Sequence, residues 1–156
     1  LFTIDSFKNY ADKDSLYVEV ETEKGSIKLL LFPKIAPYSV SSFIHLAKGG
    51  YYDKKPFHRV VPNFVIQTGC SRGDGYGSLD YYIPTETSRI YYDKPGMLGM
   101  ASAGRDTESA QWFITSSITP HLNGDYTIFG EVESGMEVVR DIQEGDLINT
   151  IEIFEK

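Results

Sequence analysis

The chain has 156 residues, of which 41% are hydrophobic, and its formal net charge is −7. This length is typical of one domain, and the hydrophobic fraction supplies a core that needs neither a disulfide nor a metal. The acidic balance excludes nucleic acid as a general partner, because phosphate binding requires an excess of Lys and Arg.

The first 15 residues are polar and of mixed charge. We expect residues 1–15 to be an N-terminal tail or a lead-in from a preceding segment, and residues 16–156 to be one domain. No signal peptide is visible, and no apolar run approaches the length that spans a membrane. We therefore expect no membrane insertion, and the compartment, cytoplasmic or periplasmic, stays open.

Two strands are predicted first along the chain. Residues 16–21 alternate between apolar and polar side chains, which is typical of a half-buried strand. Lys24 and Gly25 favour a turn, after which Ile27, Leu29 and Leu31 lie on one face of a second strand. The two strands are predicted to form a hairpin.

Two helices are predicted from apolar side chains at helical spacing. The first begins at Pro37, which is favourable in the first turn of a helix, and ends at Gly49-Gly50. The second is expected near residues 134–143, where Ser134 and Glu137 match a capping box.

Short β-like runs separated by Gly and Pro fill the rest of the chain: residues 57–60, 64–68, 97–100, 112–115, 128–132 and 148–154. Strands and helices do not alternate regularly, so a parallel α/β fold is excluded. The pattern predicts a mainly β protein, a barrel or a sandwich with helical caps.

The sequence lacks the residue patterns of three common kinds of site: a metal site, a serine nucleophile elbow and a phosphate-binding loop. The three histidines have no ligand spacing and there is a single cysteine, so we expect no metal. Residues 99–104 lack the glycine that a nucleophile elbow needs two positions before its serine. The glycine-rich residues 73–77 are not followed by the Lys-Ser/Thr pair of a phosphate-binding loop.

Residues 57–69 place three informative side chains close together. A hairpin through Pro62-Asn63 would bring Arg59, Phe64 and Gln67 onto one patch. From base rates alone, Arg59 as a surface charge and Phe64 as a core residue would be the preferred interpretation.

A resemblance changes this balance. Residues 57–69, read as Phe-His-Arg-Val-Val-Pro-x-Phe-x-x-Gln-x-Gly, resemble the signature of the cyclophilin family. Residues 98–104 with 109–115, and residues 122–132, resemble two further blocks of that family in the same order. The resemblance runs from about Tyr17 to Phe154.

The resemblance implies a closed eight-stranded antiparallel β-barrel capped by two α-helices, with a peptide groove on its outer face. It implies peptidyl-prolyl cis/trans isomerase activity that assists protein folding, proline-containing polypeptides as partners, and no cofactor. We expect a monomer, because no extended apolar pattern demands a second chain.

The resemblance also implies roles for individual residues. Arg59 would act on the prolyl bond, and Gln67 would orient Arg59 or the substrate carbonyl. The substrate-binding residues would be Phe64, Val65, Ala101, Ser102, Gln111, Phe113, His121, Leu122 and Tyr126.

Four of these positions depart from common members of the family. His121 stands where many have Trp, so weak or no cyclosporin binding is expected. Tyr126 replaces a common His, which indicates a bacterial-type member. Val65 replaces Met and Ser102 replaces Asn. These changes keep an alternative open, a module that binds proline segments or acts as a chaperone with little isomerase activity.

Overall fold

The computed structural model describes residues 10, 13, 16–73, 75, 79 and 81–155. Its main feature is one sheet of eight strands in the order β3-β4-β6-β5-β7-β2-β1-β8, in which every neighbouring pair is antiparallel. The strands are β1 (Leu16–Thr22), β2 (Gly25–Leu31), β3 (Arg59–Val61), β4 (Val65–Thr68), β5 (Met97–Met100), β6 (Trp112–Thr115), β7 (Ile128–Ser134) and β8 (Ile148–Glu155).

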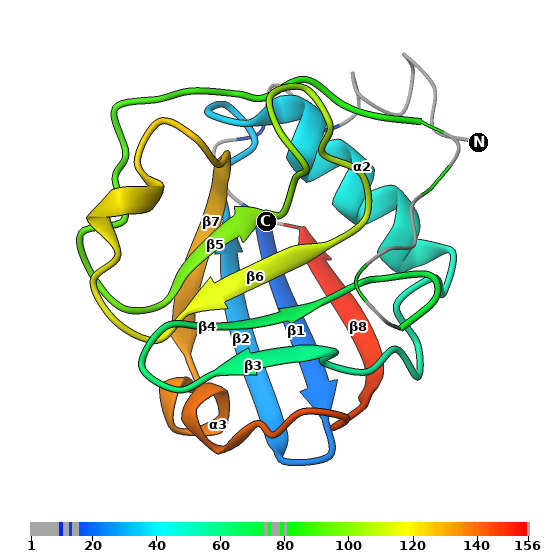
Figure 1. Cartoon of the computed structure of the whole chain (residues 1–156). Helices are drawn as coiled ribbons and strands as arrows, with labels where there is room; N and C mark the ends of the chain where they lie inside the picture. The colour runs from blue at the N-terminus through cyan, green and yellow to red at the C-terminus, as the bar shows by residue number, and fades with distance from the viewer. Residues whose placement is uncertain are drawn as a thin grey trace.

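The sheet is strongly curled, and a helix lies at each end of it (Figure 1). The helices are α2 (Pro37–Lys48) and α3 (Met136–Asp141), and a short 3-10 helix, η1, spans Pro120–Leu122. The structure thus confirms a mainly β fold of eight antiparallel strands with two α-helices.

The curled sheet is joined to itself at one end. Strands β3 and β8 are the two outermost strands, and the chain segment that precedes β3 is hydrogen-bonded to the first residue of β8 and to the segment before it. The amide of Lys54 donates to Ile148 O (2.7 Å), Phe57 N donates to Asp146 O (2.9 Å), and Ile148 N donates to Lys55 O (2.9 Å). These bonds give the backbone polar groups of both segments the partners that burial requires.

The predicted hairpin is formed by β1 and β2, paired from Leu16–Leu31 to Thr22–Gly25. Every second side chain is fully buried, including Val18, Val20 and Leu29. The period of two in the sequence therefore corresponds to one face packed in the barrel and one face outside.

Helix α2 begins at Pro37 and ends at Lys48, before Gly49-Gly50 as predicted. Its buried face centres on Phe43, whose ring packs edge-on against Trp112 (5.7 Å between centroids) and lies 5.5 Å from Phe129. No side chain of the helix's own N-cap closes its first turn; Glu86, distant in sequence, accepts hydrogen bonds from Tyr38 N (2.9 Å) and Ser39 N (2.8 Å).

The capping box predicted for the second helix is wrong. Ser134 is the last residue of β7, where it pairs with Lys28, so its backbone belongs to the sheet. Helix α3 starts two residues later, and its N-cap is Gly135 in the left-handed region (φ 101°). A Cβ at Gly135 would lie 2.7 Å from Ser26 O, so glycine is required there on two grounds.

Most of the expected N-terminal tail lies outside the described residues. Tyr10 is described: it is buried against the barrel core, and Lys48 Nζ donates a hydrogen bond of 2.7 Å to its hydroxyl. At this position the segment therefore packs on the domain.

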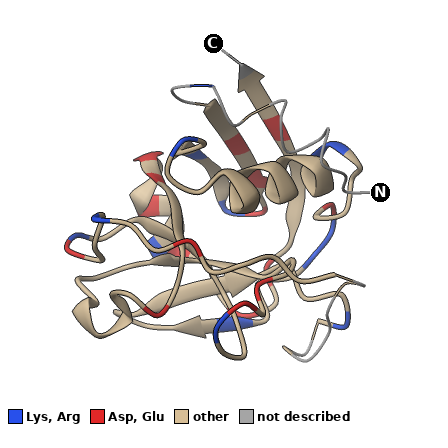
Figure 2. Ribbon diagram, turned by 90° about the horizontal axis from the view of Figure 1, so that it is seen from above, with Lys and Arg blue, Asp and Glu red and all other residues tan. Residues whose placement is uncertain are grey.

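Charged positions are spread over many loops and strands. Figure 2 shows Lys and Arg interspersed with Asp and Glu. Two salt bridges between described residues are Lys24–Asp146 (3.2 Å) and Lys94–Glu131 (2.5 Å). None of the described helices is long and apolar enough to cross a membrane. Within the described part of the chain, no group of three or more His, Cys, Asp or Glu residues is arranged to hold a metal.

Candidate active site

A cleft of about 650 Å³ opens on the outer face of β3, β4 and β6. It contains every site residue predicted from the sequence except Gln111, which lines the adjoining cleft. The lining residues are His58, Arg59, Phe64, Val65, Gln67, Gly75, Ala101, Ser102, Phe113, His121, Leu122 and Tyr126.

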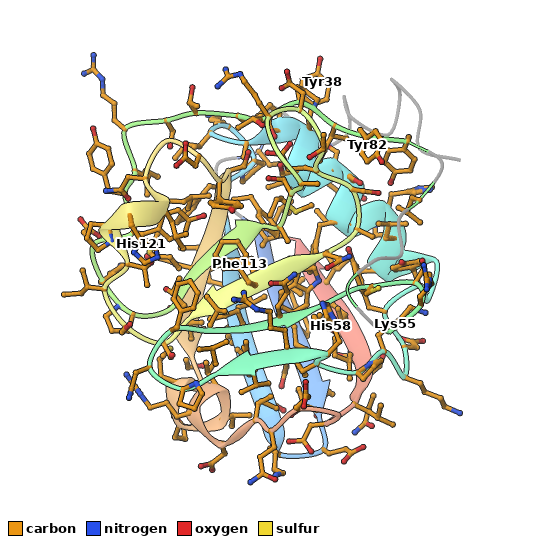
Figure 3. The ribbon with its side chains drawn as sticks, viewed as in Figure 1. Tyr38, Lys55, His58, Tyr82, Phe113 and His121 are labelled. Atoms are coloured by element: carbon orange, nitrogen blue, oxygen red, sulfur yellow. The ribbon has the colours of Figure 1, made fainter. Side chains whose placement is uncertain are left out.

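Strand alternation decides which side chains reach this cleft. On β6, Trp112 and Ile114 point into the barrel core, whereas Phe113 belongs to a second apolar cluster outside it. On β4, Ile66 points inward while Val65 and Gln67 line the cleft. Figure 3 shows Phe113 on β6, between His121 on one side and His58 on the other.

The β3–β4 hairpin brings Arg59 and Gln67 together as predicted. The two residues are direct partners across the ladder, and Arg59 Nη1 donates to Gln67 Oε1 at 3.5 Å, near the outer limit for a hydrogen bond. Gln67 Nε2 donates to Gln111 Oε1 (3.0 Å), and Gln111 Nε2 donates to Gly75 O (3.2 Å). This chain of bonds orients the amides beside an arginine whose side chain is exposed.

The floor of the cleft is apolar and almost fully buried. Val65, Phe113 and Leu122 are only 2%, 4% and 8% exposed. Tyr126 stands at the rim and meets Phe113 edge-on, with 6.0 Å between ring centroids. A small apolar ring can therefore enter between these side chains with little polar surface to desolvate.

Phe64 also lines the cleft, and its ring lies between the side chains of Arg59 and His121. The Arg59 guanidinium lies 5.7 Å from the centroid of the Phe64 ring, and the imidazole of His121 lies 5.4 Å from it. The turn before Phe64 contains Asn63 in the left-handed region (φ 60°), which Asn tolerates better than most residues. Ser117 Oγ donates to Asn63 O (2.5 Å) and holds this turn against the loop that carries His121.

Tyr92 supports the floor, and sequence reasoning missed it. Its ring stacks on Phe113 (5.9 Å, 23° between planes), and its hydroxyl donates to Tyr126 O (3.2 Å). Burial raises the pKa of the Tyr92 hydroxyl well above its usual range, so it stays a donor. No pattern in the sequence marks this residue, because it lies in a loop with no regular periodicity.

Gly99 makes room for this stack. A Cβ at position 99 would lie 2.5 Å from Phe113 Cζ and still closer to the Tyr92 hydroxyl. The two rings therefore occupy the space that a side chain on β5 would take. Residues 98–104 resemble a block of the cyclophilin family, but that resemblance does not predict the packing role of Gly99.

His58 and Gly75 also line the cleft without having been proposed as site residues. For His58 a signal was present, since it precedes Arg59 in the same motif. Gly75 lies six residues after the end of that motif, and only the fold places it at the cleft.

The groove extends past the main cleft. A second cleft of about 280 Å³ shares Gln67, Gly75, Ala101 and Ser102 with the first and adds Gln111. The amide of Ala101 donates to Gln111 O (3.0 Å), which holds the two walls in register. Together the clefts form a long open groove with an apolar pocket, suited to an extended polypeptide that carries one compact apolar residue.

The comparisons with known proteins agree with this arrangement. A family model described as "Cyclophilin type peptidyl-prolyl cis-trans isomerase/CLD" matches residues 17–154. The chain therefore belongs to the cyclophilin-type peptidyl-prolyl cis/trans isomerases, and its function is the isomerisation of peptidyl-prolyl bonds.

Several bacterial relatives are named peptidyl-prolyl cis-trans isomerases. The chain is 43% identical to a peptidyl-prolyl cis-trans isomerase of Synechococcus elongatus, covering 86% of this chain and 93% of that protein. It is 40% identical to one of Helicobacter pylori, covering 95% and 96%, and 42% identical to isomerase B of Bacillus subtilis, covering 83% and 91%. The prediction of a bacterial-type member is thereby confirmed.

Solved structures show the same fold. The crystal structure of a Cryptosporidium parvum cyclophilin-type isomerase superposes with a TM-score of 0.85 at 32% identity, covering 91% of this chain and 99% of that one. A second crystal structure of that protein, in the presence of the dipeptide Ala-Pro, has the same TM-score and identity.

Proposed function

We propose that this isomerase binds proline-containing polypeptide segments along the groove and rotates the X-Pro bond in the cleft beneath Arg59. The observation that carries the proposal is the pairing of Arg59 with Gln67 above the buried floor of Val65, Phe113 and Leu122. The Ala-Pro dipeptide used with the Cryptosporidium relative has the chemistry of such a substrate.

The barrier is the resonance of the prolyl amide, roughly 18–20 kcal/mol. No covalent step is needed; the site must bind the twisted amide better than either planar isomer. In this proposal the proline ring rests on the floor formed by Phe113 and Leu122, while the preceding carbonyl rotates. Holding the ring still converts binding energy into orientation of the reacting bond.

Arg59 would act on the atoms whose charge changes. As resonance is lost, the proline nitrogen becomes pyramidal and more basic, and the guanidinium can donate toward it or hold the carbonyl. Gln67, fixed by Gln111, would keep the guanidinium in place. One charged hydrogen bond is worth about 1.5–3 kcal/mol, which is one to two powers of ten in rate. Orientation of the substrate on the buried apolar floor must supply the rest.

The first test is the exchange rate of an Ala-Pro peptide measured by NMR with the wild type and with Arg59→Ala. Because Arg59 is exposed, the variant should fold normally and lose at least tenfold in rate. Equal rates would remove Arg59 from catalysis. If the wild type broadened the peptide lines without accelerating exchange, the chain would be a proline-binding module instead.

A further inference from the structure

The groove continues beyond Tyr126 into a third cleft of about 310 Å³. Ser102 and Tyr126 line both this cleft and the one proposed to hold proline. A polypeptide that leaves the proline cleft past Tyr126 therefore enters the third cleft directly. Because the two clefts share these two residues and an extended chain advances about 3.3 Å per residue, we take about three residues as the reach from the proline into the third cleft.

Two turns form the walls of this cleft, one containing Gly104 and the other Gly124. Both glycines have positive φ, 138° and 79°, and a Cβ at either would meet nothing within 4 Å. No neighbouring atom therefore obstructs the Cβ side of either turn.

The wall that carries Arg105 is fixed before any ligand arrives. Thr85 N donates to Asp106 Oδ1, and Asp106 N donates to Thr85 Oγ1, both at 2.9 Å. Thr107 Oγ1 donates to Gly104 O at 2.7 Å. The Asp106 carboxylate is thus engaged with the backbone of Thr85, and the turn need not be ordered on binding.

Arg105 and Asp125 are the charged residues of this cleft. Both are exposed, and among the described residues neither forms a salt bridge. The neighbouring proline cleft contributes Arg59 and, within the described residues, no carboxylate. Among the residues that line these two clefts there are two guanidinium groups and one carboxylate, that of Asp125. The Asp106 carboxylate lies beside this lining, with Oδ1 accepting the bond from Thr85 N.

We propose that the third cleft binds an acidic side chain of the substrate polypeptide, with the guanidinium of Arg105 as its partner. The isomerase would then prefer prolines that have Asp or Glu within about three residues. A guanidinium suits this task because its planar donors match a carboxylate in pairs. The inference rests on the proposed function, since it assumes that the polypeptide lies along the groove.

The experiment uses a set of ten-residue peptides around one Ala-Pro. Glu is placed at each of three positions on either side, and Gln replaces it in the matched control. Dissociation constants are measured by titration and exchange rates by NMR, at low and at high salt. At one or two adjacent positions the Glu peptide should bind about twofold to fivefold more tightly than the Gln peptide, and salt should remove the difference.

Arg105→Glu should abolish this preference and favour a Lys peptide at the same position. Arg140→Glu makes the same charge change on α3, away from the groove, and should leave the preference intact. The inference would be overturned if Glu and Gln peptides bound equally well at every position and Arg105→Glu changed none of these affinities, even if the enzyme accelerates Ala-Pro exchange. It would also be overturned if the wild type bound Lys peptides more tightly than Glu peptides and Asp125→Asn removed that difference. Absence of any acceleration with any peptide would instead count against the proposed function.

Discussion

At the scale of single residues, the cleft is built from side chains that serve both packing and function. Phe113 illustrates this, since it is 4% exposed, stacks on Tyr92 and forms the floor of the cleft. Its neighbours on the same strand, Trp112 and Ile114, belong to the barrel core instead. A change at Phe113 should therefore affect the pocket more than the barrel.

We expect Phe113→Leu to weaken binding of an Ala-Pro peptide about tenfold, because the flat ring under the proline is lost. Stability should fall by about 1 kcal/mol, since the volume is nearly conserved. Phe57→Leu is the matched control: Phe57 is fully buried against Trp112 in the barrel core. Titration and urea unfolding should show similar losses of stability in both variants and a loss of affinity only in the first. If Phe113→Leu bound the peptide as tightly as Phe57→Leu and the wild type do, Phe113 would be excluded from the pocket.

His121 belongs to the same scale. Its imidazole packs on Phe64 at the rim of the cleft and offers less apolar area than an indole. His121→Trp should therefore bind cyclosporin several-fold more tightly than the wild type, measured by calorimetric titration. Isomerisation of a short Ala-Pro peptide should change little. If the drug affinity did not increase, other departures, such as Val65 or Ser102, would have to explain a weak interaction.

At the scale of elements, Glu86 connects the start of α2 to a loop far away in the sequence. Its carboxylate accepts hydrogen bonds from Tyr38 N, Ser39 N and the Ser39 hydroxyl. The amide of Glu86 donates to Thr127 Oγ1 (2.8 Å), which in turn donates to the fully buried Glu108 (3.3 Å). A single hydrogen-bond network thus connects helix α2, the loop that carries Glu86, and Thr127, which follows Tyr126.

Burial raises the pKa of Glu86 above its usual value of 4.5, and the nearby Glu108 adds to the shift, although the bonds from Tyr38 and Ser39 oppose it. A carboxyl whose pKa is raised by folding binds its proton more tightly in the folded state. Its contribution to stability is therefore present at low pH and is lost as pH rises from about 4.5 through the raised value.

Glu86→Gln should remove this part of the pH dependence, because the amide keeps an acceptor oxygen but does not titrate. The difference in unfolding free energy between wild type and variant should change with pH, by at most about 1.4 kcal/mol per pH unit for one proton. Urea unfolding from pH 4 to pH 7 measures it. Glu152→Gln makes the same charge change at an exposed position of β8 and is the control. Parallel curves for the wild type and Glu86→Gln would contradict the assignment.

At the scale of the whole molecule, the apolar residues fall into two clusters with different tasks. One fills the barrel and includes Leu29, Phe43 and Trp112; the other lies outside it and includes Val65, Phe113 and Leu122. Strands β4 and β6 separate them, because alternate side chains on these strands enter one cluster or the other. A stable barrel can therefore tolerate an open, partly exposed groove on its outer face.

The sequence by itself determined most of the local structure. Its period-two pattern predicted the hairpin of β1 and β2, short apolar runs bounded by Gly and Pro indicated the other strands, and the helical spacing predicted α2. The predicted turn at Pro62-Asn63 placed Arg59 and Gln67 on one patch. The residues of the main cleft followed from the resemblance to the cyclophilin family and from no local pattern, since they lie in segments spread from residue 58 to residue 126. Local patterns suffice for the hairpins and α2, because the neighbours that matter there lie within a few residues along one strand, turn or helix.

Only the tertiary structure decided the rest. Ser134 matches a capping box, yet pairing with β2 takes it into β7. Glu86 caps α2, and Tyr92 with Gly99 supports the cleft floor, across tens of residues. Tyr126 and Ser102 open a third cleft because two distant turns face each other. These features depend on contacts between segments far apart in the chain, and no local periodicity can encode a contact with a distant partner.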